Sequence, residues 1–137
     1  MPTLPAVAYG TGVPVTVGLQ GQSHMNVGDA DTAIAFRSGE VPVLATPRLV
    51  ALLEEASVDA LAGHLDADQT TVGMRVQIDH LAPTGIGAEV RATATLDAVE
   101  GRRLTFSAEA TDDDTPVASA TITRVIVDTL RFLERVS

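Results

Sequence analysis

The sequence predicts an α+β fold in which one long helix packs against a curved antiparallel sheet of about five strands. Three observations lead to this fold class. A single stretch with helical periodicity begins at Thr46-Pro47, four runs with alternating apolar residues follow it, and the segments between those runs are short and turn-like. The chain has only four aromatic residues, so its core must be built mainly from aliphatic side chains, which suits a sheet packed on a helix.

The helix is predicted from its two ends and from its apolar stripe. Thr46 is a candidate N-cap, Pro47 suits the first helical position, and Gly63 lies where the helix can end. At 100° per residue one face collects only apolar side chains, and this stripe predicts a helix of about four to five turns. The residues of the stripe are Leu49, Leu52, Leu53, Ala56 and Ala60.

The strands are predicted from alternation with a period of two. One run precedes the helix at 13–19, and residues 21–31 after it are polar and rich in turn formers. The four later runs are 71–81, 88–99, 103–111 and 116–128. Their connectors at 83–85, 100–102 and 112–114 are short enough for tight reversals, which predicts an antiparallel meander. A curved sheet wrapped around the single helix is the hot-dog architecture.

The last run is apolar on both faces near its end, at Val125 to Val127. This pattern predicts either an edge strand or a second face that another subunit covers.

The length of 137 residues fits a single domain, with residues 1–12 as a flexible arm because Pro2, Pro5 and two glycines interrupt them. The chain has no cysteine, so disulfides and thiolate chemistry are excluded and a cytoplasmic location is expected. No run approaches the roughly 18 apolar residues of a membrane span, so no membrane association is expected.

The charge of the chain excludes several kinds of partner. Nine basic residues, all of them arginine, face 18 carboxylates and give a net charge of −9, which argues against binding to nucleic acid. A small anionic ligand can still be held by a local group of arginines, because charge acts over a Debye length of about 8 to 10 Å. The three histidines have no metal-binding spacing, so no metal site is predicted.

Three polar residues stand where apolar residues are expected. His80 ends the run at 71–81 on the same face as Val72, Met74, Val76 and Ile78, so its imidazole lies at the rim of the apolar layer. Such an imidazole is either hydrogen-bonded for structural reasons or poised for proton transfer.

Glu54 and Thr46 can likewise have either a structural or a catalytic role. Glu54 lies on the margin of the apolar face of the helix, either as a surface side chain or as a partly desolvated acid or base. Thr46 is either a helix cap or a hydroxyl beside the N–H groups of a helix start, which can stabilise an oxyanion.

Several segments in combination resemble the fluoroacetyl-CoA thioesterase-like branch of the hot-dog superfamily. They are Ala45-Thr46-Pro47 through Ala56, Val72-Gly73 through His80, Ala82 to Gly85, and the Val99 to Leu104 hairpin. The resemblance covers about residues 40–128 and implies that Thr46, Glu54 and His80 form the catalytic set. It also implies hydrolysis of a short-chain acyl-CoA thioester to CoA and a carboxylic acid.

The resemblance further implies that CoA enters only as part of the substrate, that no separate cofactor is bound, and that the chain forms a homodimer or a tetramer of such dimers. The predicted substrate-binding residues are the glycines that let a pantetheine arm approach, the arginines that meet the nucleotide phosphates, and one aromatic residue before the helix. They are Gly85, Gly87, Arg75, Arg102, Arg103 and Phe36. The segment 36–40 has one aromatic and two charged residues, whereas members specialised for the fluorinated substrate have more aromatic residues there, so fluoroacetyl selectivity is not predicted.

Two other functions remain open from the sequence. One is a hot-dog enoyl-CoA hydratase, a class that normally uses an aspartate and a histidine from one short segment. Asp79 and His80 are adjacent and therefore on opposite faces of a strand, which disfavours this chemistry. The other is a non-catalytic protein that binds acyl-CoA or another metabolite.

Overall fold

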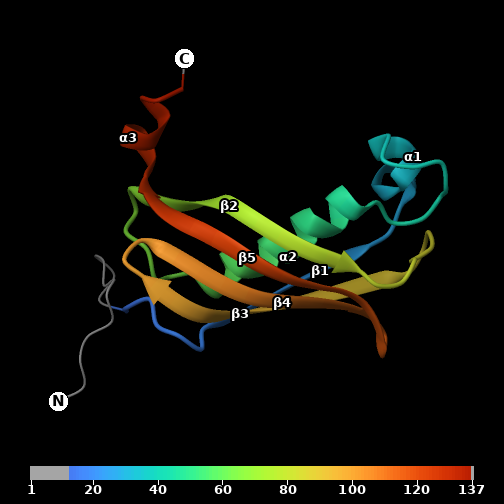
Figure 1. Cartoon of the computed structure of the whole chain (residues 1–137), viewed down its shortest axis with the longest axis horizontal. Helices are drawn as coiled ribbons and strands as arrows, with labels where there is room; N and C mark the ends of the chain where they lie inside the picture. Colours follow the sequence, from blue (N-terminus) through green and yellow to red (C-terminus); the bar gives the residue numbers. More distant parts are fainter. Residues whose placement is uncertain (1–12, 137) are drawn as a thin grey trace.

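Helix α2 (Thr46–Ala60) lies across one face of a curved five-stranded antiparallel sheet (Figure 1). The computed structural model describes residues 13–136, so the predicted arm at 1–12 lies outside the described residues. The strands are β1 (Gln20–Asn26), β2 (Gln69–His80), β3 (Glu89–Glu100), β4 (Arg103–Asp112) and β5 (Thr115–Asp128). Three short helices complete the chain: η1 (Asp29–Asp31), α1 (Ala33–Phe36) and α3 (Thr129–Leu133).

The predicted helix is confirmed, with one change at its start. Ala45 is the N-cap residue and makes no side-chain cap, while Thr46 is the first helical residue and Pro47 follows it. Thr46 therefore does not cap the helix, and its hydroxyl remains available for another partner. Gly63 lies beyond the C-terminal end with φ of +81°, a conformation that favours glycine.

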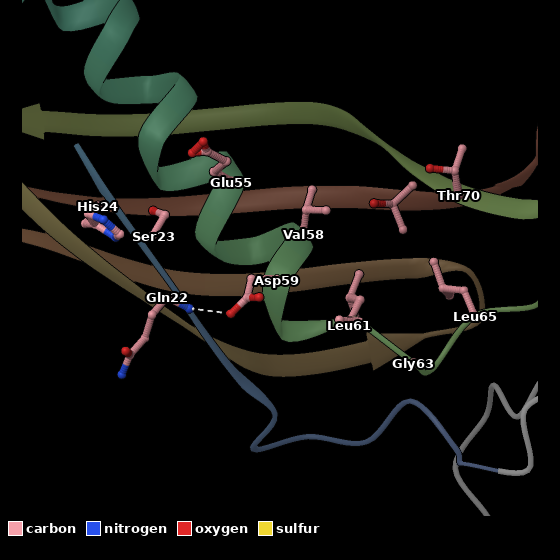
Figure 2. Close-up of a pocket in the computed structure, with 12 residues that line it drawn as sticks. Gln22, Ser23, His24, Glu55, Val58, Asp59, Leu61, Gly63, Leu65 and Thr70 are labelled. Atoms are coloured by element: carbon pink, nitrogen blue, oxygen red, sulfur yellow. Dashed lines mark hydrogen bonds between the residues drawn. The ribbon is translucent and has the colours of Figure 1, made fainter. Parts of the chain in front are cut away.

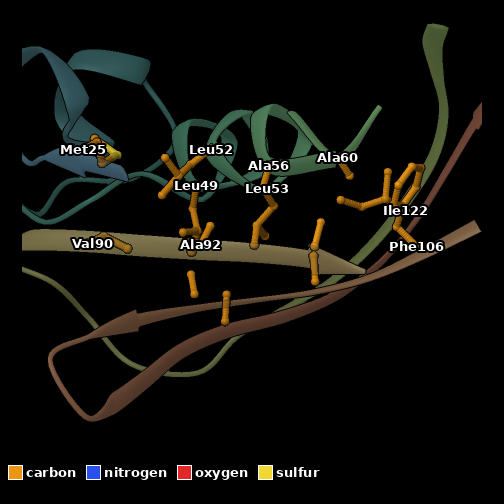
Figure 3. Close-up of a cluster of buried hydrophobic side chains, with 14 of the residues drawn as sticks. Met25, Leu49, Leu52, Leu53, Ala56, Ala60, Val90, Ala92, Phe106 and Ile122 are labelled. Carbon is orange, nitrogen blue, oxygen red and sulfur yellow. The ribbon is translucent and has the colours of Figure 1, made fainter. Parts of the chain in front are cut away.

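The apolar stripe of α2 forms the centre of the core, as predicted. Leu49, Leu52, Leu53 and Ala56 are fully buried, and they face the inward rows of β3 and β4 (Figure 3). The inward residues of these two strands are Val90, Ala92, Ala94, Leu96, Leu104, Phe106, Ala108 and Ala110. The small residues in these rows leave room for the helix, because alanine at a strand position lets the helix backbone approach the sheet.

The first strand lies later in the chain than predicted. Residues 13–19 contain only one isolated bridge residue, Val15, and a turn, whereas β1 is formed by the polar segment predicted as a loop. This segment becomes a strand because it pairs along its length with β3 and passes directly beneath the helix. Gly21 makes the close passage possible, since a Cβ there would overlap the backbone of Ala56 and Ala60.

The meander prediction holds for β3, β4 and β5 but is wrong for β2. The strand order is β1-β3-β4-β5-β2, so β2 pairs with β5 at one edge and β3 lies on the other side of the sheet. The connector after His80 is therefore a crossover. It is held by the segment before α2, because the Leu44 N–H donates to the Thr84 carbonyl at 2.8 Å.

The faces of β2 also differ from the prediction, because the register of β2 against β5 shifts between Gly73 and Arg75. The extra residue reverses the alternation. Met74, predicted to be buried, is 55% exposed, and Thr71, which strict alternation places on the opposite face from Val72 and Met74, is buried. After the shift Val76, Ile78 and His80 are each partly buried, as predicted for the end of the strand.

Strand β5 is not an edge strand, because it lies between β4 and β2. Its apolar end is half-buried on one face and buried on the other. The edges of the sheet are β1 and β2 instead, and β2 is the longer of the two at 12 residues.

We expect Gly21→Ala to destabilise the protein by about 1 to 3 kcal/mol, because the added methyl group must push α2 away from β1. Chemical denaturation measures the free energy of unfolding. Gly85→Ala is the matched control, since nothing lies within 4 Å of a Cβ at that position. Equal stabilities of the two variants would contradict the close helix–strand passage.

Candidate active site

Thr46 and His80 meet where the start of α2 faces the end of β2. The Thr46 Oγ1 and His80 Nδ1 atoms are hydrogen-bonded at 2.8 Å. Backbone hydrogen bonds of the neighbouring residues hold the two segments in place. The N–H of Leu81 donates to the Val117 carbonyl at 2.7 Å, and the N–H of Ala45 donates to the Asp31 carbonyl at 2.9 Å.

A cavity of about 350 Å³ opens beside this pair. Its walls come from the start of α1 and the loop that follows it, from the start of α2, and from the end of β2 with the segment after it. The lining residues are Ala33, Ser38, Gly39, Val41, Val43, Leu44, Thr46, His80, Leu81, Ala82 and Pro83. The size lies at the lower end of the range for small-molecule pockets, and most of the lining is apolar.

Only one of the two ring nitrogens of His80, Nδ1, is hydrogen-bonded within the described residues. The Nε2 atom is buried and makes no hydrogen bond with any residue in the described range 13–136. If Nδ1 accepts the Thr46 hydroxyl proton, Nε2 carries the ring proton. A buried donor without a partner costs free energy, so the arrangement favours a ligand or a second chain that supplies an acceptor.

Glu54 lies elsewhere, in an ion pair with Arg124. Arg124 Nη1 donates to Glu54 Oε2 at 2.8 Å, and the side chains are 8% and 31% exposed respectively. Arg124 also donates from Nε to the Thr71 hydroxyl at 2.9 Å and from Nη2 to the Thr71 carbonyl at 3.0 Å. Burial lowers the pKa of the Arg124 guanidinium, while the Glu54 carboxylate acts in the opposite direction.

Gly73 lies beside the ion pair of Glu54 and Arg124. A Cβ at Gly73 would overlap the Glu54 carboxylate, so the glycine creates the space in which the carboxylate meets Arg124. Gly85 and Gly87, the glycines predicted to let a pantetheine arm approach, have nothing within 4 Å of a Cβ at either position.

Within one chain Glu54 does not reach the Thr46–His80 pair. Glu54 lies eight residues after Thr46 on α2, which is about 12 Å along the helix axis. On the sheet, Arg124 is opposite Gly73, seven residues before His80, which corresponds to about 23 Å along the strand. The three predicted catalytic residues therefore form two separate groups in a single chain.

Arg124 was not predicted as a site residue, although the sequence carries a signal for it. It occupies the inward row of β5 between Ile122 and Ile126, both of which are buried. When a charged residue in a strand has isoleucine at both i−2 and i+2, it lies on the buried face, and this indicates that it needs an ionic partner there.

The predicted substrate-binding residues are spread over the surface. Phe36 lies in α1, is 41% exposed, and does not line the 350 Å³ cavity, although Ala33 and Ser38 near it do. Gly85 pairs with Val43 in an isolated bridge close to the cavity, and Gly87 has φ of +94° in the turn before β3.

The predicted arginines lie away from the cavity. Arg75 is exposed on β2 just after the register shift. Arg102 lies in the β3–β4 turn and Arg103 begins β4, at the end of the sheet opposite His80, and Arg102 is 3.5 Å from Asp128. A single chain therefore does not bring any of them to the Thr46–His80 pair.

A separate cleft of about 670 Å³ lies between α2 and the edges of β1 and β2 (Figure 2). Its wall includes Glu55, Val58 and Asp59 of α2, and the Gln22 N–H donates to the Asp59 carboxylate at 2.8 Å. It contains none of the three predicted catalytic residues. It is therefore not the pocket of the candidate site.

Two kinds of feature are absent from residues 13–136. No group of three or more histidine or acidic side chains in this range is arranged to hold a metal ion. No helix in the same range is long and apolar enough to cross a membrane.

Comparison with known proteins identifies the family. The family model for "Fluoroacetyl-CoA-specific thioesterase" matches residues 27–130. The chain is 35% identical over 94 residues to the fluoroacetyl-CoA thioesterase of Streptantibioticus cattleyicolor, covering 69% of this chain and 68% of that one. The chain belongs to the fluoroacetyl-CoA-specific thioesterase family.

Solved structures agree with this assignment. A variant of the fluoroacetyl-CoA-specific thioesterase, solved in complex with fluoroacetate and CoA, superposes with a TM-score of 0.80 at 31% identity, covering 86% of this chain and 99% of that one. A hot-dog-like protein from Thermanaerovibrio acidaminovorans gives a TM-score of 0.80 at 31% identity, covering 88% and 89%. The predicted hot-dog fold is confirmed in this member of the fluoroacetyl-CoA-specific thioesterase family.

We expect Arg124→Met to destabilise this family member by about 1 to 3 kcal/mol, because the Thr71 carbonyl and the Glu54 carboxylate lose buried donors. Thermal or chemical denaturation measures the change. Arg91→Met is the control, since its pair with Glu89 is exposed and worth only about 0 to 1 kcal/mol. A smaller effect at Arg124 than at Arg91 would contradict this account of the ion pair.

Proposed function

We propose that this protein hydrolyses short-chain acyl-CoA thioesters to CoA and a carboxylic acid. The observation that supports the proposal most directly is the hydrogen bond between Thr46 and His80 at the mouth of a small, mostly apolar cavity. A hydroxyl joined to an imidazole suits acyl transfer, because the imidazole can accept the proton of the attacking group. The family of thioesterases to which the chain belongs supports the same reaction.

In the proposed reaction His80 Nδ1 takes a proton from the attacking group, which is the Thr46 hydroxyl or a water molecule in contact with it. The attack forms a bond to the thioester carbonyl carbon, and the C–S bond then breaks to release the CoA sulfur, which takes up a proton. If Thr46 attacks, water hydrolyses the acyl-threonine in a second step. No bound cofactor is needed.

The oxyanion formed during attack requires donors. Pro47 has no N–H, so the first turn of α2 offers the N–H groups of Thr46 and Arg48. Both lie at the positive end of the helix dipole, beside the Thr46–His80 pair. We assign them as candidate donors, and each such donor can be worth about 10²- to 10³-fold in kcat.

We further propose that the active form is a homodimer and that Glu54 of the partner subunit completes each site. Strand β2 is a long edge strand with an unpaired outer side, Met74 on it is 55% exposed, and Val58 on the helix is 49% exposed. Antiparallel pairing of β2 with the partner's β2 sets the first half of one strand beside the second half of the other. This brings the partner's Gly73 and Glu54 towards His80, and it covers the exposed Thr46.

The acyl group is proposed to be short, and no fluoroacetyl selectivity is proposed. The cavity is small, and the segment before α2 that contributes Ser38 and Gly39 to its wall has only Phe36 as an aromatic residue. A cytoplasmic location fits the absence of cysteine.

Enoyl-CoA hydration is less well supported. Asp79 lines a cleft on the opposite side of the sheet, with Gln77 and Ser107, while His80 lines the cavity beside Thr46. The aspartate and the histidine cannot act on one substrate from opposite faces.

Replacing the histidine tests the chemistry. We expect His80→Ala to lower kcat for acetyl-CoA or propionyl-CoA by about 10²- to 10⁴-fold, because the proton acceptor is lost. Thr46→Val and Glu54→Gln should also lower kcat. Glu55→Gln is the matched control for Glu54, because Glu55 is exposed on the same turn of α2. Steady-state assays that detect free CoA measure these rates, and unchanged turnover of His80→Ala would refute the mechanism.

Mixed dimers test the shared site. A dimer of one His80→Ala subunit and one Glu54→Gln subunit contains one site with both wild-type residues if Glu54 acts on the partner's histidine. We expect such mixed dimers, isolated with two affinity tags, to regain up to half of the wild-type activity. Homodimers of each variant are the controls. Mixed dimers as inactive as the two parents would show that Glu54 does not act across the interface.

A further inference from the structure

Arginine side chains gather at the end of the sheet opposite His80. Arg102 lies in the β3–β4 turn, and Arg131 and Arg135 lie in and just after α3. All three line one cleft of about 780 Å³ together with the half-buried ring of Phe132. Three of the nine basic residues of a chain with a net charge of −9 therefore meet in a single cleft.

Two of these arginines have no anionic partner within the described residues. Arg102 lies 3.5 Å from the Asp128 carboxylate, whereas no ion pair in the range 13–136 involves Arg131 or Arg135. Both are exposed. The carboxylates that line the same cleft are Asp128 and Glu134, so the cationic charge of the cleft is not fully neutralised.

The chemistry of this cleft fits a nucleotide with several phosphate groups. Arginine forms paired hydrogen bonds with phosphate oxygens, and a half-buried aromatic ring offers a face for a base. The overall negative charge of the protein repels such a ligand, so a local group of arginines is needed to hold it. CoA carries a 3′-phosphorylated adenosine diphosphate at the end of its pantetheine arm.

The position of the cleft decides which site it can serve. Asp128, which precedes α3, is opposite Gln69 at the start of β2, whereas His80 ends that strand 11 residues later, about 36 Å away. In Figure 1, α3 stands at one end of β2 and α1 at the other, and both extend beyond the β2 edge. Antiparallel pairing along β2 therefore turns the α3 of one subunit towards the α1 end of its partner, where Thr46 and His80 lie.

We propose that Arg131 and Arg135, with Arg102 beside them, bind the nucleotide phosphates of the acyl-CoA whose thioester occupies the Thr46–His80 site of the partner subunit. This inference rests on the proposed thioesterase function and on the proposed dimer. It assigns α3, which no sequence pattern had indicated, to substrate binding. It also assigns to Arg102 the phosphate role predicted from the sequence, but across the subunit interface.

The test compares a full substrate with one that lacks the nucleotide. For the double variant Arg131→Gln/Arg135→Gln, we expect KM for acetyl-CoA to rise by at least about 10-fold with little change in kcat, because two charge-assisted contacts are lost before the chemical step. With acetyl-N-acetylcysteamine, which has no phosphate, kcat/KM should equal that of the wild type. Adenosine 3′,5′-bisphosphate should inhibit the wild type and inhibit the double variant at least about 10-fold more weakly.

The control is Arg91→Glu, which changes the net charge by the same two units on an exposed part of β3 remote from the cleft. A rise in KM for acetyl-CoA equal to that of the double variant would mean that only overall charge matters and would overturn the proposal. An unchanged KM in the double variant would overturn it as well.

Mixed dimers test the direction across the interface. In a dimer of one His80→Ala subunit and one double-variant subunit, the single active site has Arg131 and Arg135 supplied by the His80→Ala partner. We expect the wild-type KM for acetyl-CoA, and a KM as high as that of the double-variant homodimer would show that the arginines act within their own chain.

If the wild type hydrolyses neither substrate, the thioesterase function fails. If it hydrolyses both and the double variant resembles it, only the arginine assignment fails.

Discussion

The burial of the aliphatic stripe of α2 against the curved sheet is the constraint on which the rest of this structure depends. Leu49, Leu52 and Leu53 must leave water, and they do so in a core built mainly from the inward rows of β3 and β4 with side chains of β1 and β5. This fixes the axis of the helix relative to the sheet. Once the axis is fixed, the first helical residue faces the end of β2, and the hydroxyl of Thr46 comes within hydrogen-bonding distance of His80.

The same constraint places a charged group inside the protein. Glu54 lies on the margin of the buried stripe and would face a partly apolar wall, and Arg124 supplies the charge that it needs there. A buried guanidinium is costly unless its donors are used, and the Thr71 hydroxyl, the Thr71 carbonyl and the Glu54 carboxylate use them. The register shift in β2 turns Thr71 inwards so that it can accept these bonds.

A single chain holds three polar groups that follow one another along the direction of strand β2. The hydroxyl and imidazole lie at one end, the carboxylate and its arginine lie near the middle, and a cleft rich in arginine lies at the other end. In the proposed dimer an antiparallel pair of β2 strands sets the first end of one subunit beside the other end of its partner, so one symmetric interface completes two sites.

The sequence by itself determined the helix, its buried stripe, the alternation of β3 and β4, and the three polar residues Thr46, Glu54 and His80, because local periodicity depends only on the order of side chains. Tertiary structure decided the rest. Pairing with β3 made a strand of 20–26, the crossover put β2 at the edge, and the register shift reversed Met74 and Thr71. These outcomes depend on contacts between residues far apart in the chain, which no local pattern contains. For the same reason the sequence could name the three polar residues, but only the packed chain could show that Glu54 stands apart from the other two.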